Sequence, residues 1–204
     1  MEEAPKSGKN KLALFDFDGT LTLTDSMLAF MQFVNGKWAL YWSLLVMSPI
    51  LVLMKLGAYD AEKAKKALLK RHFKGMHADE LKVWATRFCH DILPTMFRDE
   101  GLEKLAFHRS KGHAVYVVTA SLDLWVEPWL RTQRIEGICT KAAWNEGVFE
   151  GEFASANCNG PEKARRILEL VNLEDFERVY AYGDSSGDRE MLALAHKAFY
   201  RRFL

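Results

Sequence analysis

Residues 12–24 read LALFDFDGTLTLT, and this stretch carries the clearest fold signal in the chain. A short apolar run ends in two aspartates, Asp16 and Asp18, immediately before Gly19 and Thr20. Because side chains alternate along a strand, the two carboxylates point the same way where the strand ends. Like charges this close repel each other, and a bound cation relieves that repulsion. Oxygen ligands beside a substrate phosphate suit Mg²⁺, so the stretch predicts a phosphate-handling metal site.

A second apolar run, residues 114–118, ends in Thr119, Ala120 and Ser121. This places a hydroxyl group and two small residues at another strand end, where backbone amides can face an anion.

A third apolar run, residues 179–182, leads into GDSSGD, which contains Asp184 and Asp188. Before it, Pro161 starts a predicted helix that carries Lys163, since proline is well tolerated in the first helical turn. The carboxyl ends of parallel strands meet at one edge of an open α/β sheet. We therefore expect these acids, hydroxyl groups and the lysine to share one site.

The order DFDGT, VVTAS, a Pro-Glu-Lys helix start and YGDSSGD resembles the haloacid dehalogenase superfamily of aspartate-nucleophile phosphatases. Within it, the chain is similar to the phosphoserine-phosphatase-like branch, subfamily IB. The resemblance covers the whole chain. It implies an α/β fold with a doubly wound, Rossmann-like parallel sheet and a helical C1 cap, and a Mg²⁺-dependent phosphatase that works through an aspartyl-phosphate intermediate.

Four residues are the predicted catalytic groups, with roles that follow from their chemistry and from the resemblance. Asp16 is the expected nucleophile, and Asp18 is expected to protonate the leaving oxygen and then to activate water. Lys163 would hold a phosphoryl oxygen as a point charge, and Thr119 would hydrogen-bond another.

The metal ligands that we expect for Mg²⁺ are Asp16, the carbonyl oxygen of Asp18, and Asp184, with Asp188 orienting a metal-bound water. A further group is expected to bind the substrate, and it comprises Gly19, Thr20, Asp25, Ala120 and Ser121.

Asp25 has two interpretations. Phosphoserine phosphatases are expected to carry an acid at this place that meets the substrate's amino group. Asp25 is equally suited to cap a helix that begins at Ser26.

Strands and helices are expected to alternate, which predicts a parallel, right-handed sheet. The expected strands are residues 11–17, 114–119, 137–141, 179–182 and 198–201; the helices are 100–110, 124–133, 161–171 and 188–196; a hairpin at 144–153 is expected beside the catalytic edge. Residues 25–94 are helical in pattern and predict a cap that selects the substrate. Residues 1–24 and 95–204 form the expected catalytic core, with residues 1–10 as a polar lead-in.

Residues 38–54, WALYWSLLVMSPILVLM, contain no charge and lie between Lys37 and Lys55. They are short for a membrane span, and Pro49 is expected to divide them. Three alternatives remain. The segment packs inside the cap or a dimer, it meets a lipid or a membrane surface with help from the basic run at 63–74, or it is an anchor.

The net charge of +1 argues against nucleic acid as a partner, and three cysteines without CxxC spacing fit a reducing cytoplasm. The expected partner is a phosphorylated small molecule or a lipid phosphate head, with peripheral contact at the inner face of the membrane as one option. Phosphotransfer to an alcohol and a non-catalytic membrane-binding role are the alternative functions, and no oligomeric state is predicted.

Overall fold

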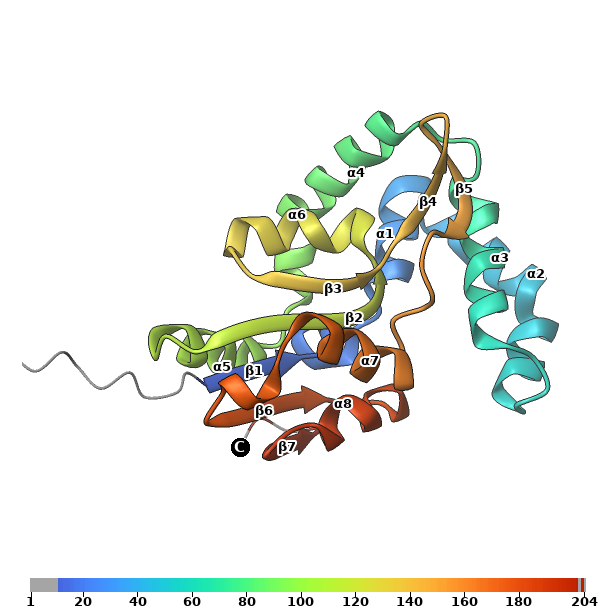
Figure 1. Cartoon of the computed structure of the whole chain (residues 1–204). Coiled ribbons are helices and arrows are strands. Elements are labelled where there is room, and N and C mark those ends of the chain that lie inside the picture. Colours follow the sequence, from blue (N-terminus) through green and yellow to red (C-terminus); the bar gives the residue numbers. More distant parts are fainter. Residues whose placement is uncertain (1–10, 202, 204) are drawn as a thin grey trace, which may run out of the picture.

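The computed structural model describes residues 11–201 and residue 203, so the predicted lead-in at residues 1–10 lies outside the described residues. Five parallel strands form the sheet in the order β3-β2-β1-β6-β7 (Figure 1). The strands are β1 (Lys11–Phe15), β2 (Ala114–Leu122), β3 (Glu136–Thr140), β6 (Arg178–Gly183) and β7 (Lys197–Tyr200). The predicted α/β class and parallel sheet are confirmed.

Helices cover both faces of the sheet, as a doubly wound fold requires. Residues of β1 alternate between two apolar clusters, with Leu12 and Leu14 on one face and Ala13 and Phe15 on the other. The helices that follow the sheet strands are α5 (Asp99–Ser110), α6 (Asp123–Gln133), α7 (Pro161–Leu170) and α8 (Arg189–Ala193). The Leu12 face packs on α7 and α8, and the Phe15 face packs on α5 and α6.

The predicted helix at 188–196 is too long, because α8 ends at Ala193. Beyond it, the amides of Leu194 and Ala195 bond three residues back, which tightens the chain. Nδ1 of His196 then accepts a hydrogen bond from the amide of Val179 at 3.0 Å. This contact ties the end of the helix to the start of β6.

The strand order places the topological switch point between β1 and β6. The chain moves from β1 to β2 and β3 on one side, and then to β6 and β7 on the other. Ligands of open α/β sheets bind in the crevice at such a point, beyond the carboxyl ends of the strands. The DFDGT and GDSSGD motifs leave the sheet on either side of this crevice.

Four helices between β1 and α5 lie beside this edge, and we call them the helical cap (Figure 1). They are α1 (Ser26–Asn35), α2 (Lys37–Lys55), α3 (Ala61–Phe73) and α4 (Ala78–Asp91). The helical character predicted for this interval is confirmed. The expected break at Pro49 is wrong, because α2 continues through that residue.

The hairpin formed by β4 (Ala142–Asn145) and β5 (Val148–Phe153) leaves the catalytic edge and packs on α3 of the cap (Figure 1). Phe149 exchanges backbone hydrogen bonds of 3.0 Å with Gly75 and Met76. Gly151 allows this close approach, since a Cβ atom there would lie 2.7 Å from Cα of Lys70. We therefore propose that the hairpin belongs with the cap rather than with the sheet.

The imidazole of His108 on α5 is fully buried against β6, where Nε2 contacts the hydroxyl oxygen of Tyr182 at 2.9 Å. Burial, assisted by His113, lowers the pKa of His108 to about 4. Below pH 6.5 His108 therefore binds a proton in the unfolded chain but not in the folded chain. As a result, the free energy of unfolding decreases as the pH falls.

We expect His108 to reduce the free energy of unfolding by about 2 kcal/mol between pH 7 and pH 5. His108→Gln keeps a hydrogen-bonding side chain but removes the titration, so this part of the pH dependence should disappear in urea unfolding. The exposed His90→Gln variant is the control and should behave as the parent protein does. An unchanged pH dependence in His108→Gln would contradict the assignment.

Candidate active site

Three carboxylates meet at the switch point between β1 and β6. One oxygen from each of Asp16, Asp184 and Asp188 lies within 4.8 Å of the other two. Asp16 directly follows β1 and is fixed by its amide, which donates to the carbonyl oxygen of Tyr182 at 2.9 Å. The sequence-based prediction that the two motifs converge is therefore reproduced in the geometry.

Asp188 is positioned by the turn that precedes α8. Its Oδ2 accepts hydrogen bonds from the Ser185 amide at 2.9 Å, the Ser185 hydroxyl at 2.8 Å and the Asp184 amide at 3.1 Å. The Ser185 hydroxyl in turn accepts from the Gly187 amide, which completes a reciprocal capping box. These bonds leave Asp188 little freedom to reorient.

Lys163 joins the strand ends through one buried ammonium. Nζ donates to Oδ1 of Asp16 at 2.5 Å and to Oδ1 of Asp188 at 2.6 Å, and the lysine side chain is 2% exposed. It reaches the acids from the first turn of α7, which begins at Pro161 as predicted. A buried ion pair of this kind persists only where each charge has partners.

The electrostatics of the site show an excess of negative charge. Burial raises the pKa of Asp16 to about 7 against the attraction of Lys163, and the charge of Asp188 adds to the rise. Burial also raises the pKa of Asp184, again with help from Asp188. Burial opposes ionisation of Asp188 as well, but Lys163 outweighs it and the pKa falls below its usual value. One ammonium does not balance these acids, which favours a bound cation.

Asp18 lies on the same edge and is held by two serines that are far apart from each other in the sequence. Its Oδ2 accepts from the Ser121 hydroxyl at 2.5 Å, and its Oδ1 accepts from the Ser26 amide at 2.6 Å. Burial raises the pKa of Asp18, and the nearby charge of Asp25 adds to the rise. A raised pKa favours the protonated form that a general acid needs.

The second motif lies beside Asp18 at the end of β2. Oγ1 of Thr119 is buried and accepts a hydrogen bond from the Ser121 amide at 3.0 Å. The carbonyl oxygen of Ala120 accepts from Nζ of Lys65, a cap residue, at 2.6 Å. Ala120 therefore meets the cap through its carbonyl group, and Ser121 binds Asp18.

A cavity of about 360 Å³ opens between the catalytic edge and the cap. Its polar end holds the predicted residues Asp16, Asp18, Asp25, Thr119, Ala120, Ser121 and Lys163, joined by Asn159 and Ser185. The cap side adds one cation, Lys65, and an apolar wall that includes Leu44, Leu51 and Met54 of α2 and Leu68 of α3. A ligand here would meet charges at one end and hydrocarbon at the other.

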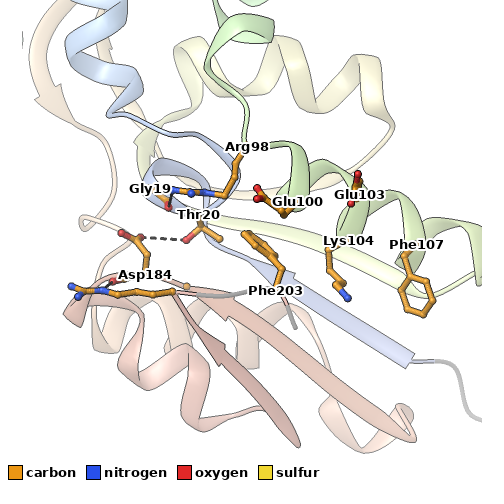
Figure 2. Close-up of a pocket in the computed structure, with 11 residues that line it drawn as sticks. Gly19, Thr20, Arg98, Glu100, Glu103, Lys104, Phe107, Asp184 and Phe203 are labelled. Carbon is orange, nitrogen blue, oxygen red and sulfur yellow. Dashed lines mark hydrogen bonds between the residues drawn. The ribbon is translucent and has the colours of Figure 1, made fainter.

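Gly19 and Thr20 do not line this cavity. They face a second cavity of about 810 Å³ on the other side of Asp184, with Arg98 and Phe203 on its walls (Figure 2). The Thr20 hydroxyl donates to Oδ1 of Asp184 at 3.3 Å. Gly19 has φ of +79°, and a Cβ atom would lie 2.5 Å from Oδ2 of Asp184. Gly19 therefore leaves room for the Asp184 carboxylate, and Thr20 donates a hydrogen bond to it.

Asp25 caps α1, because its Oδ1 accepts from the Leu28 amide at 3.0 Å. The same side chain also lines the cap-side cavity, so the two interpretations of this residue are compatible.

Besides Asn159, three residues that line or support the site were missed from the sequence. Ser185 had a usable signal, since serine three residues before Asp188 matches a capping box. Ser26 follows a recognisable helix start, but nothing in the sequence pairs it with Asp18. Lys65 is one lysine in a basic run, and only the folding of the cap onto β2 singles it out.

A family model described as haloacid dehalogenase-like hydrolase matches residues 13–193 of this chain. Among curated proteins, the chain is 33% identical to protein CicA of Caulobacter vibrioides over 94% of this chain and 86% of that protein. It is 28% identical to the probable phosphatase Rv3661 of Mycobacterium tuberculosis, over 90% of this chain and 66% of that protein.

Solved structures share the fold. A protein of unknown function from Bordetella pertussis superposes with a TM-score of 0.79 at 23% identity, covering 93% of this chain and 89% of that one. A phospho-aspartyl intermediate analogue of phosphoserine phosphatase gives a TM-score of 0.64 at 18% identity, over 93% of this chain and 85% of that one.

Replacing Lys163 by methionine removes the cation between Asp16 and Asp188 while keeping most of the side-chain volume. In metal-free buffer we expect a loss of about 3–5 kcal/mol in the free energy of unfolding, because two buried carboxylates lose their partner. Adding Asp16→Asn to this variant should restore part of the lost free energy of unfolding, because it removes one of the two buried carboxylates.

Urea unfolding measures both effects, with the exposed Lys82→Met as the matched control. A Lys163→Met protein as stable as the control would show that the ion pair is not what holds the acids together.

Proposed function

This chain belongs to the haloacid dehalogenase-like hydrolase family, and on that premise we propose that it is a Mg²⁺-dependent phosphatase that works through an aspartyl-phosphate intermediate. The observation that carries the proposal is the pairing of buried Asp16 with Lys163, beside Asp18, at the polar end of one cavity. A nucleophile, a cation and a proton donor are what hydrolysis of a phosphate monoester demands.

In the first step, a carboxylate oxygen of Asp16 attacks phosphorus in line with the leaving oxygen. The bond from Asp16 to phosphorus forms as the bond to the substrate's alcohol oxygen breaks, and Asp18 gives that oxygen its proton. Lys163 lies within 2.5 Å of Asp16 and offsets charge on the phosphoryl group as it is transferred.

In the second step, Asp18 takes a proton from water, which attacks the phosphorus of the aspartyl-phosphate. Inorganic phosphate leaves and Asp16 is regenerated. Ser121 and Ser26 hold both oxygens of Asp18, so the same carboxyl group stays in place for both proton transfers. Thr119 and the amides near Ala120 are the proposed hydrogen-bond donors to the phosphoryl oxygens.

The residues at the switch point fit Mg²⁺ by their chemistry, since they offer three carboxylates as oxygen ligands beside only one ammonium. Asp16 and Asp184, with the carbonyl oxygen of Asp18, are the proposed ligands. Asp188 already uses Oδ1 for Lys163 and Oδ2 for the Ser185 turn, so we assign it to orienting a metal-bound water. When bound, the ion supplies positive charge that stabilises the transferring phosphoryl group.

We propose a lipid phosphate head as the substrate, with phosphatidylglycerophosphate as the example to test and phosphatidylglycerophosphatase C as the activity to compare. Three side chains of α2 line the wall opposite the acids, namely Leu44, Leu51 and Met54. Such a wall favours a phosphate ester with a hydrocarbon portion. A small soluble phosphate ester is the alternative, favoured by Lys65 and Asp25 at the polar end. Both substrates are consistent with a cytoplasmic protein, which the lipid would bring to the inner face of the membrane.

The decisive assay measures Mg²⁺-dependent phosphate release from phosphatidylglycerophosphate in mixed micelles, beside phosphoserine and p-nitrophenyl phosphate. We expect Asp16→Asn to lower turnover of every substrate by roughly a thousandfold or more, because no intermediate forms. Chelation of Mg²⁺ should abolish release by the parent protein. Mass spectrometry after rapid quenching should find one phosphoryl group on the parent protein and none on Asp16→Asn.

The exposed Asp79→Asn variant is the matched control and should retain full activity. Undiminished turnover by Asp16→Asn would place the nucleophile elsewhere, and no release from any of the three esters would sink the proposal.

Lys65 is the residue that we expect to separate substrates by size. Its Nζ bonds to Ala120 and is attracted by Asp18 and Asp25, so it stands where the cap meets the leaving group. Lys65→Met should lower kcat/KM for p-nitrophenyl phosphate by roughly tenfold to a hundredfold, mainly through KM. Acetyl phosphate, whose organic part is too small to reach the cap, should be far less affected.

Steady-state kinetics on both esters test this expectation, with the exposed Lys63→Met on the same helix as control. Equal losses for the two esters would assign Lys65 to the phosphoryl group instead of the leaving group.

A further inference from the structure

Helix α2 exposes an apolar stripe along its whole length. The stripe residues follow one another at intervals of four and three, which places them on one side of a helix. They are Trp38, Trp42, Leu45, Pro49, Val52 and Leu56, which we call the outer stripe. Trp38 is 75% exposed and Trp42 is 61% exposed, so this side of the segment does not pack inside the cap.

The other side of α2 is apolar as well, and it is used. Leu40 and Met47 are buried in the cap, and Leu44, Leu51 and Met54 line the catalytic cavity. A helix at the surface of a water-soluble protein normally turns a polar side outward. A continuous exposed apolar face of this kind marks a contact surface.

Charges around the outer stripe indicate what it contacts. Between Asp25 and Asp60 the chain has no acidic residue, and its only charges are Lys37 and Lys55 at the two ends of α2. Exposed Lys63 on α3 and Lys74, which directly follows α3, add to the positive charge. Lysines that flank a helix with tryptophan and aliphatic side chains match an anionic bilayer, whose headgroups are negative and whose interior is hydrocarbon.

A second copy of the chain is a poorer match for the same surface. In a two-fold dimer the outer stripe of one copy would contact the outer stripe of the other. The lysines at the two ends of α2 would then lie against lysines or against apolar side chains of the second copy. Nothing acidic within α2 is available to pair with those lysines. A lipid surface supplies both the hydrocarbon and the negative charge.

By length and composition α2 is able to cross a bilayer, with 19 residues and a mean hydropathy of 1.5. Its neighbours argue against crossing. Ser26 on α1 binds Asp18, and Lys65 on α3 binds Ala120, so the helices on both sides of α2 touch one catalytic edge. A helix that spans the bilayer would place those two helices on opposite sides of it.

We propose that α2 lies in the plane of an anionic membrane surface and docks the protein there through the outer stripe. The inner side of the same helix lines the catalytic cavity, so docking would leave only the thickness of α2 between the lipid and the apolar wall of the cavity. Docking itself is independent of the proposed activity, whereas delivery of a lipid phosphate to Asp16 rests on the proposed phosphatase function.

The test is co-sedimentation with vesicles of phosphatidylcholine containing phosphatidylglycerol, and with vesicles of phosphatidylcholine alone. The intact protein should bind the anionic vesicles, and added salt should weaken the binding. A Trp38→Ser/Trp42→Ser/Leu45→Ser variant should lower the bound-to-free ratio roughly tenfold or more. The control replaces exposed leucines on the far helix α7, as Leu168→Ser/Leu170→Ser, and should bind as the parent does.

Hydrolysis of p-nitrophenyl phosphate shows that each variant is folded, and it separates the two proposals. Vesicle binding without hydrolysis by the parent protein would support docking and overturn the phosphatase. Hydrolysis without vesicle binding, or equal binding by the parent and the stripe variant, would overturn docking. Sedimentation equilibrium adds a further outcome, since a dimer that Trp42→Glu converts to monomers would assign the stripe to a second copy and overturn docking.

Discussion

The arrangement of the catalytic edge depends on one buried ammonium, Nζ of Lys163, held between Asp16 and Asp188. Two strand ends and the start of α7 meet at this point. Each contributes a charged side chain, and burial of such a charge without an oppositely charged partner would be strongly unfavourable. Close backbone approaches keep the acids together, because Gly19 and Gly183 leave space for the carboxylates beside them. The remaining negative charge is what makes the site suitable for a divalent cation and a phosphoryl group.

The cap and the core meet through groups that we propose take part in the chemistry. Asp18 is bonded to Ser121 on β2 and to Ser26 at the start of α1, so the proposed acid and base is oriented by both parts of the fold. Trp125 of α6 donates to the Ser26 hydroxyl at 3.0 Å and extends the contact into the core. Lys65 makes a second bridge to Ala120. Direct contacts thus join both the cap and the core to the group that we propose transfers the proton.

Helix α2 of the cap is unusual because it is apolar on both sides. Its inner side closes the cavity, while its outer stripe, beginning at Trp38, faces away from the protein. The β4–β5 hairpin packs on α3 and joins this helical layer to the end of β3. The outer side of α2 is exposed and contributes little to the packed core, which is why we propose that it serves contact with a surface.

Local sequence patterns predict the α/β class, the strand ends that carry Asp16 and Asp184, and the helix start that carries Lys163, because these signals are runs and turns of neighbouring residues. They do not reveal that Thr20 supports Asp184, that Lys65 reaches Ala120, or which side of α2 is exposed. Those contacts depend on how segments that are distant in the sequence pack together. The sequence pattern of an apolar helix is the same whether a given face is buried or exposed to solvent, so the neighbours of each side chain are known only from the tertiary structure.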